Sequence, residues 1–510
     1  MAESFFFRSC TITNTIKYHV ICNNCFLVSI LHQTNSFFHF RVTQASPSLP
    51  EEEKMRETLA PLVLMLCFTL GAANRVYVHP FSLFAYDNFS CEVILAQAQK
   101  PLEMVKPTPI DHQGSAEPDL HTHKGVAGSK EKMEQKVAIL AMLQNTLGVR
   151  FYHTLTQQKA TNAVFSPVNA FGTLVIFYMG ASNATAEKLQ QLLGLSADGK
   201  TKHCVPFFDG HKVLRTQQRI KSLVDASSDE LRTRVWTFVN SGTDLSQEFM
   251  RNMQDVSDAS YIRSVDFSKP EEAEAQVSSF LQKTSSGNTK DLFKDISPSM
   301  NLLFLSSVHF KGNWGTAFKT EAESLQKFWI DEETSVEVPF ISHTGNFKYL
   351  NKKVGRHTII ELPLGKKTSM LLVVAHEGSS LEHITANLNT DIISQWRQQL
   401  SEGFLEVSLP KLSVSFVSNL KESLSSMKLA FLLGEQADFG RLSNKHNLTL
   451  DKVLNNVVFE MSEGGADNQA VLEDGRVALK LTINRPFFFA MVEGKSDAIL
   501  LLGWITNPTQ

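Results

Sequence analysis

The spacing of apolar residues changes along the chain from a helical period to a strand pattern. Over residues 137–151 apolar side chains recur every three or four positions, which predicts an amphipathic helix with one buried face. A second helix is expected to begin at Ser166-Pro167 and to end at Gly180, because serine suits an N-cap and proline the first turn. A third helix is expected over residues 184–193.

Later segments are rich in β-branched and aromatic residues, which favour strands. The run at 302–310 is apolar almost throughout, as in a central strand that is buried on both faces. Further strands are expected at 235–239, 358–363, 370–374, 404–410, 486–492 and 498–503. Helices first and long strands later predict an α+β domain, which we place at residues 135–510.

Composition narrows the class of protein. Hydrophobic residues make up 43% of the chain and charged residues 20%, which is ordinary for a folded core. A net charge of −3 argues against a dedicated nucleic-acid binder, since such domains carry a basic excess. No Gly-x-Ser-x-Gly turn, His-Glu-x-x-His helix or catalytic cysteine context is present, so we expect no enzyme, no cofactor and no metal site.

Three patterns resemble binding motifs but have simpler explanations. Residues 194–201 match the letters of a nucleotide-binding P-loop, yet a helix is expected before them where a P-loop needs a buried strand. His121 and His123 offer two metal ligands without a third nearby. A basic cluster has the charge to bind a polyanion but is interpreted as a solvated face; it comprises Lys200, Lys202, Lys212, Arg215, Arg219 and Lys221.

The start of the chain carries a secretory pattern. In residues 55–73 a basic residue is followed by an apolar stretch and then by small residues, which predicts a signal peptide cut between Ala73 and Asn74. The alternative is a membrane anchor, but the stretch is shorter than the ~20 residues that span a bilayer. Residues 1–54 lie upstream and show no helix or strand periodicity, so we interpret them as an extension that the mature, extracellular protein lacks.

Removal of the signal leaves two of the six cysteines, Cys91 and Cys204. In an oxidising compartment the simplest outcome is one disulfide between them, and the alternative is two unrelated thiols. Residues 84–134 are expected to be a tail and linker, because the stretch 100–130 is rich in proline, glycine and polar residues. A Cys91–Cys204 bridge would therefore join the tail to the folded body.

Three Asn-x-Ser/Thr patterns are candidate glycan acceptors in a secreted chain. Asn88 and Asn447 are plausible sites, whereas Asn183 lies in a short turn between two expected helices and is less suitable.

The ten residues after the signal read NRVYVHPFSL and resemble the angiotensin peptide hormones. Arg75 supplies a permanent cation and His79 a group that titrates near neutral pH. Pro80 fixes its own backbone and restricts His79, which lowers the ordering cost when a receptor binds. The alternative is an N-terminal flap that matches by chance. The matching residues are Arg75, Val76, Tyr77, Val78, His79, Pro80, Phe81 and Leu83.

The resemblance to these hormones implies two cuts. An aspartic protease, renin in that system, would cleave between Leu83 and Phe84 and release residues 74–83. Angiotensin-converting enzyme, a dipeptidyl carboxypeptidase, would then remove Ser82 and Leu83 and leave residues 74–81, ending at Phe81, as a vasoactive ligand of the angiotensin receptor. Asn74 departs from the aspartate that is common at the first position. We expect this change to alter the charge of the peptide rather than its identity.

The body resembles the serpin family in four segments that follow the family's order along the chain. They are 163–194, 308–318, 407–439 and 484–508. The resemblance implies a serpin fold, with N-terminal helices, a large central sheet and further sheets, preceded by the flexible tail that carries the hormone.

The serpin resemblance leaves three functions open: a hormone precursor, a protease inhibitor and a carrier of apolar hormones. Inhibitory serpins insert a reactive loop, whose hinge is rich in small residues, into the central sheet. Here Asp467, Asn468 and Gln469 stand where that hinge has alanines, after Gly464-Gly465-Ala466. Burying an unpaired aspartate costs several kcal/mol, which argues against inhibition. We therefore expect a non-inhibitory precursor in which the Cys91–Cys204 bridge sets how the Leu83–Phe84 bond is presented.

Overall fold

The computed structural model describes two units, residues 1–77 and 78–510. Within the first unit the backbone of three strands is described. In the second unit the described residues are 78–87, 101–110, 117–119, 130–157, 161–197, 207–225, 230–254, 257–285, 296–312, 325–352, 355–411, 413–444, 448–461 and 477–509.

The first unit contains a three-stranded antiparallel sheet in the order β1-β2-β3. The strands are β1 (Thr15–Cys22), β2 (Phe26–Gln33) and β3 (Phe38–Gln44). The expectation that residues 1–54 lack strand periodicity is wrong for these segments. Apolar and polar residues alternate in β1 and β3, and β2 is largely apolar, which is a strand pattern. Whether these residues belong to the mature protein stays a prediction.

A six-stranded sheet forms one half of the body, in the order β16-β17-β10-β7-β9-β5. The run predicted to be a central strand, β10 (Leu302–Gly312), lies inside this sheet between a parallel and an antiparallel neighbour. Its apolar side chains are buried on both faces, as predicted. The other strands are β5 (Thr108–Pro109), β7 (Glu230–Asn240), β9 (Ala259–Val265), β16 (Ser413–Asn419) and β17 (Leu450–Met461).

A nine-stranded sheet forms the other half, in the order β18-β15-β12-β13-β14-β19-β20-β6, with β11 paired to β12. The C-terminal hairpin of β19 (Phe487–Glu493) and β20 (Ile499–Ile505) is buried at every position. The remaining strands are β6 (Asn162–Phe165), β11 (Leu325–Trp329), β12 (Ser335–Lys352), β13 (His357–Leu364), β14 (Thr368–Ala375), β15 (Ser401–Pro410) and β18 (Leu479–Thr482). The predicted strand segments therefore lie in strands, except that Pro486 and Ala498 stand one residue before β19 and β20.

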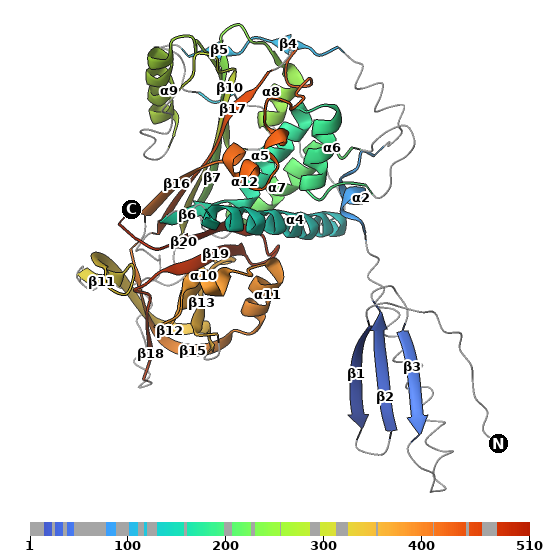
Figure 1. Cartoon of the computed structure of the whole chain (residues 1–510), viewed down its shortest axis with the longest axis vertical. Coiled ribbons are helices and arrows are strands. Elements are labelled where there is room, and N and C mark those ends of the chain that lie inside the picture. The colour runs from blue at the N-terminus through green and yellow to red at the C-terminus, as the bar shows by residue number, and fades with distance from the viewer. Residues whose placement is uncertain are drawn as a thin grey trace, which may run out of the picture. The chain divides into compact units, whose positions relative to one another are not determined.

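The three predicted helices are α4 (Lys130–Gln157), α5 (Pro167–Gly180) and α6 (Asn183–Leu192). The Ser166 side chain accepts a hydrogen bond from the Asn169 amide, which confirms the predicted N-cap. Figure 1 shows α5, α6 and α7 (Gly210–Asp225) lying beside one another next to α4. Other helices are α8 (Gln247–Gln254), α9 (Pro270–Thr284), α10 (Leu381–Thr385), α11 (Thr390–Gln398), α12 (Leu420–Ser426) and the short 3₁₀ helix Ala430–Leu432.

Part of the expected linker is bound to the body. We call residues 101–110 and 117–119 the edge segment. Its strands β4 (Met104–Val105) and β5 pair with β8 (Leu245–Ser246) and β9. The Asp119 carboxylate accepts hydrogen bonds from the Ile262 amide and from the Arg263 guanidinium, both at 2.9 Å. The edge segment thus covers the outer edge of the six-stranded sheet, contrary to the expectation of a linker without order.

Candidate cleavage site

The second half of the hormone-like peptide folds as a short helix, α2 (Pro80–Phe84). Pro80 occupies the first helical position, where its missing amide hydrogen costs nothing. The His79 ring nitrogen Nδ1 accepts a hydrogen bond from the Phe81 amide at 3.3 Å and caps this end. Ala85 closes the other end, because its amide bonds to the Phe81 carbonyl oxygen at 2.8 Å and its backbone is extended. The expected cleavage bond therefore lies in the last turn of a helix.

Both residues that flank this bond are buried. Leu83 is 6% exposed and Phe84 is completely enclosed, and both belong to the main hydrophobic core of the body. Burying a leucine or phenylalanine side chain stabilises by about 1.5–3 kcal/mol, so withdrawing both costs about 3–6 kcal/mol. The expectation of a flexible tail therefore does not hold for residues 80–84, which pack beside α4 and α7 (Figure 1).

The backbone beyond the bond is fixed to the start of α7. The Asp209 amide donates a hydrogen bond to the Phe84 carbonyl oxygen at 2.7 Å, and Ala85 forms an antiparallel bridge with Phe208. The Phe208 ring stacks on Tyr178 with 3.9 Å between ring centroids. The Tyr178 hydroxyl donates to the Phe208 carbonyl oxygen at 2.9 Å. A buried aromatic pair therefore supports the segment with which Ala85 forms its bridge.

Lys212 of α7 contacts the same segment. Its Nζ donates to the Ala85 carbonyl oxygen and to the Asp87 carboxylate, each at 2.7 Å. The hydrogen bond and charge of Lys212 lower the pKa of Asp87, with smaller contributions from Lys136 and Lys132. Burial, followed by the charge of Lys212, lowers the pKa of Lys136. The segment after the bond is thus held by a charged contact in addition to apolar packing.

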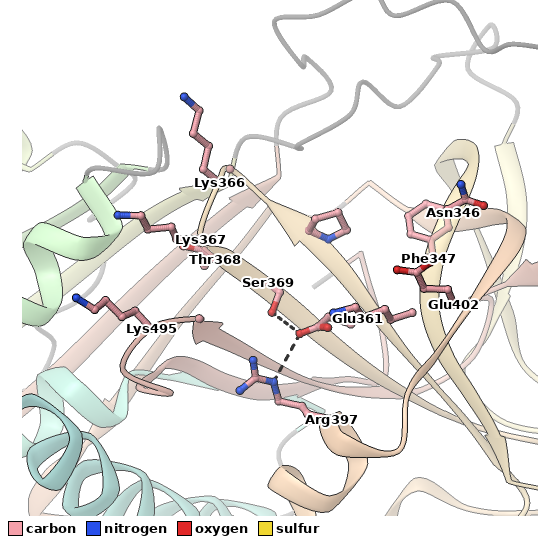
Figure 2. Close-up of a pocket in the computed structure, with 14 residues that line it drawn as sticks. Asn346, Phe347, Glu361, Lys366, Lys367, Thr368, Ser369, Arg397, Glu402 and Lys495 are labelled. Atoms are coloured by element: carbon pink, nitrogen blue, oxygen red, sulfur yellow. Dashed lines mark hydrogen bonds and ion pairs between the residues drawn. The ribbon is translucent and has the colours of Figure 1, made fainter. Parts of the chain in front are cut away.

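A cavity of about 700 Å³ lies elsewhere, over β12, β13 and β14, and Figure 2 shows its lining. The Ser369 hydroxyl donates to the Glu361 carboxylate at 2.7 Å, and Arg397 lies 3.6 Å from the same carboxylate. In Figure 2 the side chains of Lys366, Lys367 and Lys495 are directed away from Glu361. The cavity lining contains no histidine or cysteine, so it lacks a serine–histidine or cysteine–histidine pair for nucleophilic catalysis.

Two absences hold for the described part of the chain. No group of three or more metal-ligating side chains is placed there to hold a metal ion. None of the helices described is long and apolar enough to cross a membrane.

Similarity to known proteins identifies the body. Residues 142–508 match the family described as Serpin (serine protease inhibitor). The chain belongs to the serpin family. Angiotensinogen of Bos taurus is 32% identical over 467 residues, which cover 88% of this serpin and 97% of the relative. Angiotensinogen of Homo sapiens is 30% identical over 480 residues, which cover 90% and 99%. The chain is therefore an angiotensinogen-like serpin.

Solved serpin structures confirm the predicted fold. Mouse protein-Z dependent protease inhibitor aligns with a TM-score of 0.66 at 23% identity, covering 74% of this chain and all of that one. Thyroxine-binding globulin in complex with thyroxine aligns with a TM-score of 0.63 at 23% identity, covering 73% of this chain and all of that one. The two structures therefore support the architecture of the fold.

Several predicted site residues of this serpin lie outside the described residues. The structure therefore leaves the disulfide, two glycan acceptors, the signal cleavage and the reactive-loop hinge as predictions. The predicted site residues outside the described part of the chain are Ala73, Asn74, Arg75, Val76, Tyr77, Asn88, Cys91, Cys204, Asn447, Gly464, Gly465, Ala466 and Asp467.

The third glycan pattern is described and is engaged in the serpin body. The Asn183 side-chain amide donates to the Asp438 carboxylate at 2.8 Å. The Thr185 hydroxyl is buried and accepts a hydrogen bond from the Asp438 amide at 2.9 Å. Both side chains of the pattern therefore have a structural role in joining α6 to the segment around Asp438.

The P-loop-like run has the helical context that was expected. Helix α6 precedes Gly194, whose backbone has a left-handed φ of 71°. Residues 194–197 follow the end of this helix rather than a buried strand, so the described part of the run lacks the strand–loop geometry of a phosphate site.

The contacts of Phe208, Asp209 and Lys212 with the cleavage segment were missed by the sequence reasoning. Lys212 belongs to the basic cluster that is interpreted above as a solvated face, whereas its side chain is only 13% exposed. Its partner Asp87 lies 125 residues earlier, and no periodic pattern connects the two positions. Side-chain type alone carried no signal for this pairing.

Proposed function

We propose that this serpin is the secreted precursor of an angiotensin-like peptide hormone. Renin, an aspartic protease, would cut between Leu83 and Phe84 and release residues 74–83. Angiotensin-converting enzyme would trim the product to residues 74–81, which would act on the angiotensin receptor in blood pressure and fluid regulation. The relatives named angiotensinogen, which match along about nine-tenths of the chain, support this assignment.

One structural observation carries the proposal. The bond that the hormone resemblance selects is the one whose two flanking side chains enter the core at the end of α2. A bond in a buried helical turn cannot enter a protease cleft, which binds an extended peptide. The body would therefore hold the bond closed, and cleavage would follow local opening of residues 80–87. On this account the serpin controls the rate of release, while the peptide defines the product.

The expected disulfide fits this arrangement. Ala85 and Phe208 are bridged, and Cys91 follows Ala85 by six residues while Cys204 precedes Phe208 by four. These short chain separations from a bridged pair are compatible with a bond between the two thiols. Oxidation would then restrict the opening of residues 85–87, and reduction would ease it.

The function is tested by incubating the folded protein with renin and analysing the products by mass spectrometry. We expect one early product that ends at Leu83 and begins at Asn74, together with a body that begins at Phe84. Incubation with serine proteases is the companion experiment, in which we expect no stable covalent complex. Such a complex, or the absence of any cut after Leu83, would overturn the proposed function.

A further inference from the structure

Lys212 is the charged group that reaches the backbone just beyond the expected cleavage bond. Its side chain is 13% exposed, and its Nζ bonds the Ala85 carbonyl oxygen and the Asp87 carboxylate. We propose that Lys212 is a positioning residue that holds the Leu83–Phe84 bond closed, and that loosening this contact speeds cleavage. This proposal rests on the function proposed above and names a residue that controls the rate of cleavage.

The place of Lys212 in α7 gives its side chain a fixed origin. The Asp209 carboxylate accepts hydrogen bonds from the His211 and Lys212 amides, at 2.9 Å and 3.3 Å. The Thr216 hydroxyl donates to the Lys212 carbonyl oxygen at 2.7 Å. Because Asp209 also anchors Phe84 through its own amide, the same helical turn holds the chain on both sides of Ala85. Lys212 thus adds a charged contact to the apolar packing of Leu83 and Phe84.

The contact lies where opening of the segment would begin. Phe84 is enclosed, Ala85 and Tyr86 are half-buried, and Asp87 is 88% exposed. Exposure therefore increases from Phe84 to Asp87, so we expect opening on this side of the bond to begin at residues 85–87. A hydrogen bond to a charged donor is stronger than a neutral one, so Lys212 makes the strongest polar contact at this step. Lys212 therefore has more influence on the opening than its position outside the core implies.

Neighbouring charges strengthen the attraction. Lys132 and Lys136, as well as Lys212, attract the Asp87 carboxylate. Release of Asp87 would leave these cations without its compensating charge. Dissolved salt screens such a contact at the surface, so the closed form should weaken as ionic strength rises.

The kinetic consequence follows from a two-state equilibrium. If the protease binds only the open form, its apparent affinity is reduced by the fraction that is open. A change at Lys212 should therefore lower KM and raise kcat/KM while kcat stays constant. A role of Lys212 in protease contact would not give this combination, and hydrogen exchange at amides outside residues 80–87 separates local opening from a loss of overall stability.

The test compares Lys212→Met with the wild-type protein in two measurements. The first is kcat/KM for renin on the folded protein and on a synthetic peptide of residues 74–87. The second is hydrogen exchange at the Ala85 amide, which bonds to Phe81 across α2 and needs no protease. We expect kcat/KM on the variant protein and the exchange rate both to rise about tenfold, equivalent to about 1.4 kcal/mol. The peptide lacks α7 and serves as the reference for an open substrate.

Two variants control for charge and helix effects. Lys212→Arg keeps a donor and should restore slow cleavage, whereas Arg215→Met removes an exposed cation from the same helix and should change little. If Lys212→Met fails to fold, Asp87→Asn tests the exposed half of the contact; it keeps the bond from Lys212 to Ala85, so we expect a smaller rise in kcat/KM and in Ala85 exchange. About 0.5 M salt should speed exchange at Ala85 in the wild type and leave the Lys212→Met rate unchanged.

The outcomes separate the two proposals. Equal Ala85 exchange and equal kcat/KM in the wild type and Lys212→Met would overturn the role of Lys212. Faster exchange in the variant, with no cut after Leu83 in either the protein or the peptide, would support the closure by Lys212 and overturn the proposed function instead.

Discussion

The Asp209 amide donates a hydrogen bond to the Phe84 carbonyl oxygen across 2.7 Å, although the two residues lie 125 positions apart in the chain. This bond fixes the residue that follows the expected cleavage point to the first turn of α7. The buried Phe84 ring and the Ala85–Phe208 bridge act in the same direction. The C-terminal end of the hormone-like peptide is therefore packed into the serpin body.

The first prediction concerns the edge segment and its anchor. Arg263 is 7% exposed and Asp119 30% exposed in their ion pair, so Asp119→Ala would leave a buried cation with fewer acceptors. We expect a loss of about 2–4 kcal/mol in the free energy of unfolding, measured in urea. Faster hydrogen exchange should appear at the Ile262 amide, which donates to the Asp119 carboxylate.

The matched control for the edge segment is the exposed pair Lys269–Glu272. Glu272→Gln should change the free energy of unfolding by less than about 1 kcal/mol, because exposed pairs contribute little. If Asp119→Ala changed the free energy of unfolding as little as this control, the contact of residues 117–119 with β9 would not stabilise the fold.

The second prediction concerns stability at alkaline pH. Burial raises the pKa of Tyr152 to about 12 in the folded protein, from 10.0. The unfolded chain therefore releases this proton first, and stability should fall as pH rises above 10 towards 12, by up to about 3 kcal/mol. Below pH 10 both states are protonated and the effect is absent.

The variant that checks this slope is Tyr152→Phe, which keeps the ring that packs edge-on against Phe488 and Trp504. Urea unfolding at several values between pH 9 and pH 11 should show a shallower decline for the variant than for the wild type. Parallel curves would mean that Tyr152 does not titrate as a buried phenol.

Features that depend on neighbouring residues could be predicted from the sequence, whereas features that depend on contacts between distant elements could not. The start of α5 was predictable because Ser166 and Pro167 are a local helix-start signal. The strand β10 was predictable because its continuous apolar run is typical of a strand buried on both faces. The burial of Phe84 depends on Phe208 and Tyr178, which come from distant elements. A proline-rich composition also concealed the order of the edge segment, because its strands are only two residues long.

The alternating residues of β1 and β3 carried a readable signal that was overlooked. Ile16, Tyr18 and Val20 occupy one face of β1 by their spacing, which is a strand pattern within a segment that had been set aside as an extension. Position in a chain does not decide whether a segment has structure.

The third prediction concerns Cys91 and Cys204. If their disulfide restricts opening beside Ala85, replacing both with serine should raise kcat/KM for renin on the folded protein. The double variant should also remove any difference between oxidising and reducing buffers. Cleavage kinetics that are identical in the wild type and the double variant, under both buffers, would show that the bridge does not regulate presentation of the bond.

The most direct measurement of the account compares renin cleavage of the folded protein with cleavage of the free peptide 74–87. Withdrawing Leu83 and Phe84 costs about 3–6 kcal/mol, so the peptide should be cut at Leu83–Phe84 with a kcat/KM about 10² to 10⁴ times that of the protein. Equal rates would contradict a bond held closed by the serpin body, and a peptide that renin leaves intact would contradict the precursor itself.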